Sequence, residues 1–259
     1  MKRLTIILLI LLAVNLLMVS DSSAVQQVDA ESSLKKANEL YINKNYDSAI
    51  SEYEKLVSEG FESVELFYNL GNAYYRSGRY GYAVLNYERA LKLSPADEDV
   101  IHNIALVNSQ LVDKVDTLPK FFLFQWWESL LAVFSLSGWT TIAYILLILV
   151  LLAAIGYFFS ITLVQQKISV VSGIVSIILL LLSVSILIVR LNREVNLKAG
   201  VVVEQAVTVK LAPDEKSNDG FIIHEGLKVK VEDRIDDWLK IRLEDGKIGW
   251  IPGDKVRVI

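Results

Sequence analysis

The sequence predicts a membrane protein of several domains: an α-helical repeat array, a two-helix transmembrane hairpin and a small all-β barrel. Three observations lead to this prediction. Charged residues are absent from the long runs 4–20, 129–166 and 168–189. Residues 30–97 contain two copies of one internal repeat. Residues 200–259 consist of short apolar segments separated by turn residues.

Composition excludes several other classes of protein. Hydrophobic residues make up 53% of the chain, but they are concentrated in those uncharged runs, which argues against both a soluble globule and a transporter with many spans. The chain has no cysteine, and His102 and His224 have no neighbour at metal-ligand spacing, so we expect no disulfide, metal or cofactor. The net charge of −4 with interspersed signs argues against nucleic acid as a partner.

The first element is a predicted signal peptide, residues 1–24. Lys2 and Arg3 precede an apolar run that ends at Val19, and small residues precede a cleavage site after Ala24. The apolar run is slightly long for a signal, so an uncleaved anchor helix is the alternative. In either case the segment that follows is exported.

Residues 142–164 and 168–189 are predicted to be two transmembrane helices, because each is long enough to cross about 30 Å of hydrocarbon. Only residues 165–167 separate them, which predicts a tight hairpin with both soluble parts on one side of the membrane. The signal peptide places that side in the periplasm of a bacterial inner membrane. The positive-inside count disagrees mildly, since Lys167 is alone at the tip whereas Arg190, Arg193 and Lys198 follow the second helix.

The hairpin contains no ionisable residue of the kind that marks an ion path, which argues against transport by this chain. Small residues recur on one face of each helix, and they predict either a hairpin that packs on itself or a docking face for the helices of a partner: Ala153, Gly156 and Ser160, then Ser169, Gly173, Ser176 and Ser183. The aromatic residues of segment 119–139 suit the headgroup layer and predict an interfacial segment.

The repeat resembles the tetratricopeptide repeat (TPR), a pair of antiparallel helices. A shift by one repeat period places Tyr53 on Tyr87, and the second copy carries the large-small pattern of that family: Phe67, Leu70, Gly71, Tyr74, Ala83, Tyr87, Ala90 and Pro95. We expect a domain over 31–113, with repeats over 30–63 and 64–97. A capping helix over 98–113 follows the helix-start pair Ser94 and Pro95 and closes the apolar end of the stack.

The TPR resemblance implies a concave surface that holds a peptide or a partner protein. Carrying the register of the first helix of each repeat across the array predicts seven groove residues: Asn38, Tyr41, Tyr68, Asn72, Tyr75, Arg76 and His102. The two asparagines could bond the backbone or a carboxylate of the bound segment. The alternative is that these tyrosines and asparagines only fill a polar helix face.

The end of the chain is predicted to be all-β, with strands at 201–203, 207–211, 227–231, 238–243, 248–251 and 256–259 and turns at 214–220, 225–226, 245–246 and 252–253. In the run that begins at Trp238, alternation places Leu239, Ile241 and Leu243 on one face. This length and pattern predict a closed barrel. Trp238, the Asp245-Gly246 hairpin and the Gly249-Trp250 pair resemble a bacterial SH3 (SH3b) domain over residues 200–259. That resemblance implies binding of cell-wall peptides.

The whole order of segments resembles the BatE-like proteins of the Bacteroides aerotolerance (Bat) operon. That resemblance implies a scaffold without enzymatic activity that binds envelope proteins, among them von Willebrand A-domain membrane proteins of the same operon, and a role in stress tolerance. The alternative is an envelope anchor that acts mainly through peptidoglycan binding by its SH3b domain. We expect no catalytic residues, because no paired carboxylates occur in an identifiable cleft motif.

Overall fold

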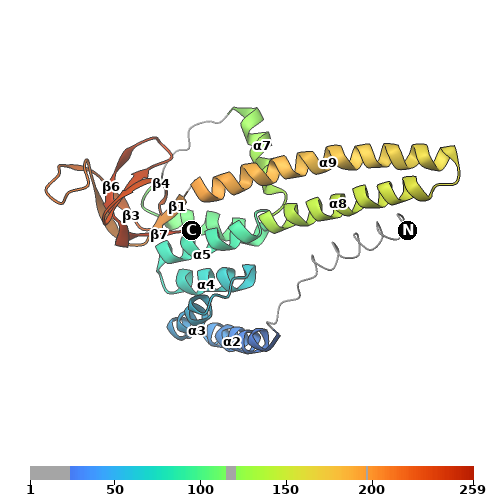
Figure 1. Cartoon of the computed structure of the whole chain (residues 1–259). Coiled ribbons are helices and arrows are strands. Elements are labelled where there is room, and N and C mark those ends of the chain that lie inside the picture. The colour runs from blue at the N-terminus through green and yellow to red at the C-terminus, as the bar shows by residue number, and fades with distance from the viewer. Residues whose placement is uncertain (1–23, 115–120, 197) are drawn as a thin grey trace. The chain divides into compact units, whose positions relative to one another are not determined.

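The computed structural model describes residues 24–114, 121–196 and 198–259 (Figure 1). The predicted signal peptide lies outside the described residues except for Ala24. The chain divides into two compact units. Among the described residues, one unit contains 24–31 and 138–187, and the other contains 32–114, 121–137, 188–196 and 198–259.

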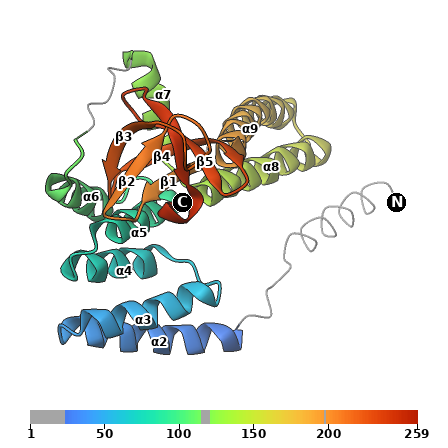
Figure 2. The same ribbon diagram turned by 90° about the vertical axis from the view of Figure 1, so that its left-hand side faces the viewer.

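Five helices in chain order form the helical array, and the predicted helical repeat is confirmed. They are α2 (Ala24–Ile42), α3 (Tyr46–Ser58), α4 (Val64–Arg76), α5 (Tyr80–Leu93) and α6 (Glu98–Gln110). Figure 2 shows α2 to α5 stacked in order. Ala83 and Ala90 of the predicted pattern are fully buried between the helices, and so are Ala37 and Ala49 in the first copy.

The turn between the helices of each repeat is the same in both copies. The amides of Gly78 and Arg79 donate to carbonyls in the last turn of α4, and the amides of Lys44 and Asn45 do the same at the equivalent positions after α2. This is the Schellman arrangement, which requires a left-handed residue after the helix. Gly78 adopts it with φ 77° and Lys44 with φ 63°. The first copy therefore keeps the turn although it lacks the glycine.

Helix starts also repeat, and the end of the last helix corrects one predicted boundary. The side chains of Ser63 and Asp97, which are equivalent in the repeat register, each accept a hydrogen bond of 3.1 Å from an amide in the first turn that follows. The last helix of the array thus begins after Asp97, at the predicted residue 98. It ends at Gln110, before the predicted residue 113, because Leu111 is extended with ψ 147°.

The hairpin helices are α8 (Leu136–Phe159) and α9 (Leu163–Asn196). By length and composition, Leu136–Phe159 and Leu163–Asn192 are each sufficient to cross a membrane. The connection comprises residues 160–162, which corrects the predicted tip at 165–167. Gln165 is the reason: its side chain accepts from the amide of Thr162, and its own amide donates to the Thr162 hydroxyl. Such a capping box starts a helix.

The two apolar helices pack on each other through small residues. A Cβ added to Gly156 would lie 2.9 Å from the hydroxyl of Ser169, and one added to Gly173 would lie 3.4 Å from the Cβ of Ala153. The buried hydroxyl of Ser183 donates to the backbone carbonyl of Trp139. These contacts account for the small residues by packing within the hairpin.

Within the predicted aromatic segment 119–139, residues 119 and 120 lie outside the described part of the chain. The rest contains α7 (Phe122–Ala132). Its large side chains are exposed: Phe122, Leu123, Phe124 and Trp126, together with the preceding Phe121. Helix α7 thus presents an apolar aromatic surface.

The last part of the chain, the sheet domain, is one antiparallel sheet of seven strands in the order β3-β2-β6-β5-β4-β1-β7. The strands are β1 (Lys198–Val202), β2 (Ala206–Lys210), β3 (Asp219–His224), β4 (Lys228–Ile235), β5 (Trp238–Arg242), β6 (Ile248–Pro252) and β7 (Val256–Val258). Strand β3 was not predicted, because its apolar part is only three residues long after a run of turn residues. The sheet order has β3 and β7 at its two ends.

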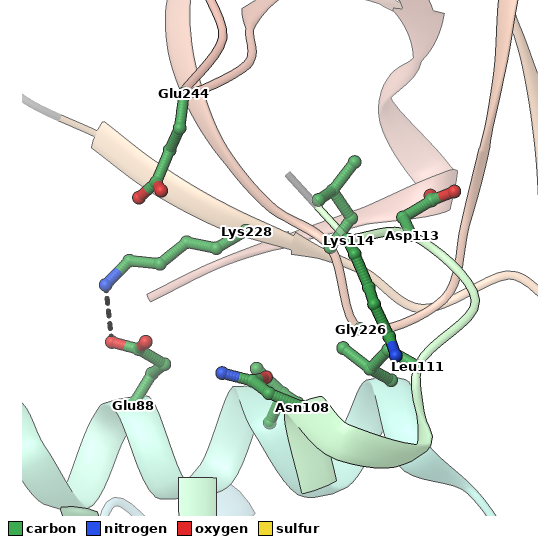
Figure 3. A pocket seen from close by; sticks show the side chains of 10 residues that line it. Glu88, Asn108, Leu111, Asp113, Lys114, Gly226, Lys228 and Glu244 are labelled. Carbon is green, nitrogen blue, oxygen red and sulfur yellow. Dashed lines mark hydrogen bonds and ion pairs between the residues drawn. The ribbon is translucent and has the colours of Figure 1, made fainter. Parts of the chain in front are cut away.

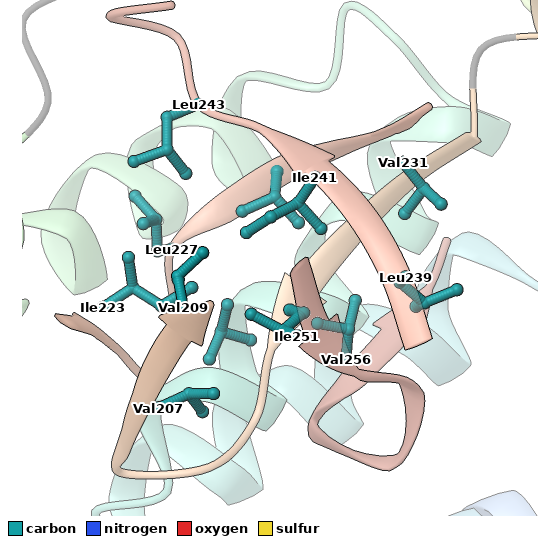
Figure 4. Packing of buried hydrophobic residues seen from close by; sticks show 12 residues of the cluster. Val207, Val209, Ile223, Leu227, Val231, Leu239, Ile241, Leu243, Ile251 and Val256 are labelled. Atoms are coloured by element: carbon teal, nitrogen blue, oxygen red, sulfur yellow. The ribbon is translucent and has the colours of Figure 1, made fainter. Parts of the chain in front are cut away.

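The sheet wraps one hydrophobic core to which all seven strands contribute (Figure 4). The alternation predicted in β5 is confirmed, since Leu239, Ile241 and Leu243 are buried. A Cβ on Gly249 would lie 2.3 Å from a methyl group of Val209. The glycine of the Gly-Trp pair is therefore needed for the close approach of β2 and β6.

Candidate functional site

Asn38 and Asn72, the two predicted groove asparagines, bond to tyrosines inside the array. The hydroxyl of Tyr53 donates to Asn38 Oδ1 over 2.6 Å, and the hydroxyl of Tyr87 donates to Asn72 Oδ1 over the same distance. Both tyrosines are almost completely buried. Each repeat therefore joins its two helices through one asparagine–tyrosine hydrogen bond in the same place.

Each of these asparagine oxygens also accepts a hydrogen bond from the next helix pair. Asn69 Nδ2 donates to Asn38 Oδ1 over 3.1 Å, and Asn103 Nδ2 donates to Asn72 Oδ1 over 2.9 Å. Asn69 and Asn103 are again separated by one repeat period. We call the two asparagine–tyrosine pairs with these two donors the asparagine ladder. It consists of two equivalent hydrogen-bond networks, of which one joins α2, α3 and α4 and the other joins α4, α5 and α6.

The ladder engages three of the seven predicted groove residues. Asn38 and Asn72 each accept two hydrogen bonds, and the Tyr68 hydroxyl accepts one from Asn103 over 3.1 Å. An amide oxygen has two lone pairs, so the oxygens of Asn38 and Asn72 have no acceptor capacity left for a ligand. This arrangement supports the alternative that these side chains fill a polar face between the helices.

The other predicted groove residues lie outside the ladder. Tyr41 packs against Tyr46 with ring centroids 5.5 Å apart, and Tyr75 packs against Tyr80 at 5.7 Å, so this aromatic pair also repeats with the period of the array. Arg76 is exposed at the end of α4 and interacts with the Tyr41 hydroxyl, which raises the pKa of its guanidinium.

His102 is exposed on α6. The predicted groove residues outside the ladder are thus Tyr41, Tyr75, Arg76 and His102. They include two aromatic rings and the cationic guanidinium of Arg76. We call these four residues the outer groove residues. They can offer hydrogen-bond donors and ring faces to a bound polypeptide.

Burial keeps the ladder tyrosines neutral. Desolvation raises the pKa of both Tyr53 and Tyr87 above its ordinary value of 10.0. A neutral phenol donates its proton to the asparagine oxygen, which cannot itself donate. The ladder therefore has a fixed direction, from tyrosine to asparagine, over the physiological pH range.

A second set of polar contacts joins the helical array to the sheet domain, and we call it the junction (Figure 3). The amide of Gly81 at the start of α5 donates to Glu225 Oε2 over 2.9 Å. Lys228 at the start of β4 reaches Glu88 on α5, with Nζ and Oε2 2.6 Å apart. The junction thus ties the turn between β3 and β4 to one face of α5.

The end of α6 completes the junction. Asp113 accepts from the backbone amide of His224 over 2.6 Å and lies 2.9 Å from the imidazole Nδ1 of the same residue. Leu111 is 8% exposed, and a Cβ on Gly226 would lie 2.5 Å from its methyl group. Gly226 also has φ 85°. Both its conformation and the space it leaves for Leu111 require glycine at this position.

A cavity of about 340 Å³ remains at the junction, and polar side chains line much of it. Two of its charged residues, Glu88 and Lys228, already form an ion pair. No group of three or more His, Asp or Glu side chains that could hold a metal ion occurs among the residues the structure describes.

The family comparison matches the second helix pair of the array. Residues 64–97 match the family model of the tetratricopeptide repeat. The matched TPR contains α4, α5 and the bonded pair Asn72 and Tyr87. No curated protein matches the chain.

Several residues of the helical array and the junction were not predicted from the sequence. Asn69 and Asn103 could have been identified from the sequence, because they are separated by the same repeat period as Asn38 and Asn72. Nothing in the sequence distinguishes Glu225 and Lys228 as contact residues, since charged residues beside a turn are usually solvated.

Proposed function

We propose that this chain is a membrane-anchored scaffold without catalytic activity, whose TPR array holds a partner protein. The observation that carries the proposal is the TPR match at 64–97, because TPR units generally mediate binding between proteins. The asparagine ladder supports it by making the array a connected body. The outer groove residues are then the contact surface, because the oxygens of Asn38 and Asn72 are already bonded within the array.

The membrane part of the proposal is supported by two helices of sufficient length and apolarity. In this proposal they form a two-pass anchor in a bacterial inner membrane, with both soluble parts on the periplasmic side as the predicted signal peptide requires. Protease treatment of intact spheroplasts tests the topology. Digestion of both the array and the sheet domain is expected, whereas digestion of only one would exclude a two-pass hairpin.

The sheet domain is proposed to be an SH3b-like barrel that contacts a second envelope protein or the cell wall. Its seven strands around one core support this proposal. The resemblance to the BatE-like proteins extends the proposal to von Willebrand A-domain partners and to stress tolerance. Sedimentation of the full chain with purified peptidoglycan, against an unrelated membrane protein, tests the wall contact.

Affinity capture from detergent-solubilised membranes of the source bacterium tests partner binding. The full chain is expected to recover a reproducible set of envelope proteins. Arg76→Glu combined with His102→Ala changes two exposed outer groove residues and is expected to abolish that recovery. Lys55→Glu is the matched control, since Lys55 is exposed on α3 and the substitution makes the same charge change as Arg76→Glu. Equal recovery by all three proteins would refute the assigned surface.

A further inference from the structure

A second cavity, of about 460 Å³, lies where the helical array, the start of α8 and α9 meet within one compact unit. Three basic side chains line it: Arg89 and Lys92 from α5 and Arg190 from α9. Glu62 is the acidic side chain among its lining residues. We call this the basic cavity.

Arg89 is held in the basic cavity under an electrostatic penalty. Its guanidinium lies 5.7 Å from the ring centroid of Phe67 and is half-buried. Desolvation lowers the pKa of Arg89, Glu62 opposes this change, and the positive charge of Arg257 adds a smaller decrease. In the described part of the chain no acidic side chain forms an ion pair with Arg89. An anion entering the cavity would relieve this penalty.

Arg190 is positioned at the wall of the basic cavity by the chain that precedes α8. Its Nη1 donates to the carbonyl of Leu131 and, over 3.1 Å, to that of Phe134. The hydroxyls of Ser135 and Ser137, which are 3.0 Å apart, also belong to the lining. Guanidinium, ammonium and hydroxyl groups together form the donor set that proteins use for phosphate.

The position of the basic cavity along the chain indicates which phosphate is available. Ser135 and Ser137 stand at the start of the apolar run of α8, and Arg190 follows the end of the uncharged run of α9. Both points fall at the same end of the proposed membrane hairpin, where lipid headgroups lie. Basic pockets at that depth bind anionic headgroups.

We propose that the basic cavity binds a phosphate group, supplied by the headgroup of an anionic phospholipid such as phosphatidylglycerol. Arg89 and Lys92 contact the phosphate from the array, and Arg190 contacts it from the membrane helix. The lipid source rests on the proposed membrane attachment, whereas phosphate binding does not rest on partner binding.

The test uses the full chain in detergent and native mass spectrometry to measure binding of dihexanoyl phosphatidylglycerol. Dihexanoyl glycerol, which has the same chains without phosphate, and inorganic phosphate are the comparison probes. Arg89→Gln with Lys92→Gln is expected to weaken phosphatidylglycerol binding roughly 30-fold, from the typical worth of two basic residues near anionic lipid. Lys35→Gln with Lys55→Gln removes the same charge from exposed positions on α2 and α3 and is expected to change nothing.

A conservative variant protects the test against misfolding. Arg89→Lys with Lys92→Arg keeps both charges and is expected to retain most of the binding. Competition by inorganic phosphate at equal affinity would support the phosphate site and reject the lipid as its source. Equal binding of dihexanoyl glycerol, or equal loss of binding in the charge-matched control, would overturn the proposal. Partner capture tests the outer groove residues and not the basic cavity. A negative result for phosphatidylglycerol binding would therefore not contradict the proposed scaffold function.

Discussion

The asparagine ladder predicts that Asn72 and Tyr87 are energetically coupled. Tyr87 is 1% exposed, and its hydroxyl has Asn72 Oδ1 as its acceptor. Asn72→Ala leaves that buried hydroxyl without a partner, which costs about 1–3 kcal/mol. Asn103 also loses one acceptor but keeps Tyr68. The better helix propensity of alanine returns about 0.5 kcal/mol, so we expect a net loss near 1.5 kcal/mol.

Tyr87→Phe removes the donor and preserves the shape of the ring. Asn72 Oδ1 then still accepts from Asn103, so the expected loss is only about 1 kcal/mol. In the double variant neither a buried donor nor its acceptor remains unpaired. Its loss is therefore expected to be smaller than the sum of the single losses by about 1 kcal/mol or more.

Hydrogen exchange of the full chain, followed in peptides from α4 and α5, measures these effects locally. A loss of about 1.5 kcal/mol corresponds to roughly 12-fold faster exchange for amides that open with the repeat. Tyr75→Phe is the control, since Tyr75 is half-buried and contacts Tyr80 through its ring. Strict additivity of Asn72→Ala and Tyr87→Phe would refute the ladder as a stabilising network.

Four further outcomes are expected. Gly71→Ala would place a Cβ 2.6 Å from the Tyr87 ring, so thermal unfolding followed by circular dichroism should show a loss of about 1–3 kcal/mol. Lys44→Gly removes the strain of a lysine in the left-handed conformation, so the stability of the first repeat should rise by about 0.5–1 kcal/mol. Hydrogen exchange in α2 and α3 should slow accordingly. Lys228→Glu should raise exchange around Glu88 in α5 modestly, because a surface ion pair is worth about 0.2–1 kcal/mol, and Glu88→Lys in the same chain should reverse it. Burial raises the pKa of the ladder tyrosines, so their contribution is complete below pH 10 and should decline above it as the unfolded chain ionises, which a denaturation series at alkaline pH would detect.

The helical array could be predicted because the sequence contains two copies of the same repeat. The shift by one repeat period identified both helix pairs and brought Asn38 and Asn72 to attention. It did not reveal their partners, since Tyr53 and Tyr87 meet them across a helix pair 15 residues away. A register shows that two residues are equivalent, whereas a hydrogen bond depends on the angle between two helices.

The hairpin and the sheet show two other limits of the sequence. The helix connection was misplaced because hydropathy treats Gln165 as a break, although its position three residues after Thr162 makes it a cap. Strand β3 was missed because three apolar residues give too short a pattern to count alternation. The junction could not be predicted, since Glu225 and Lys228 become informative only when α5 lies beside them.

The junction also changes the expected role of α6. The end of a repeat array needs a capping element with a polar outer face, and α6 was predicted to be that element. Ile101 and Leu106 on α6 remain 47% and 41% exposed, so this helix does not present a polar end. The sheet domain instead covers part of the end, through the Gly81 amide on α5 and the Leu111 side chain after α6. The array and the sheet domain therefore complete each other's surface, and a partner of one meets a body that includes both.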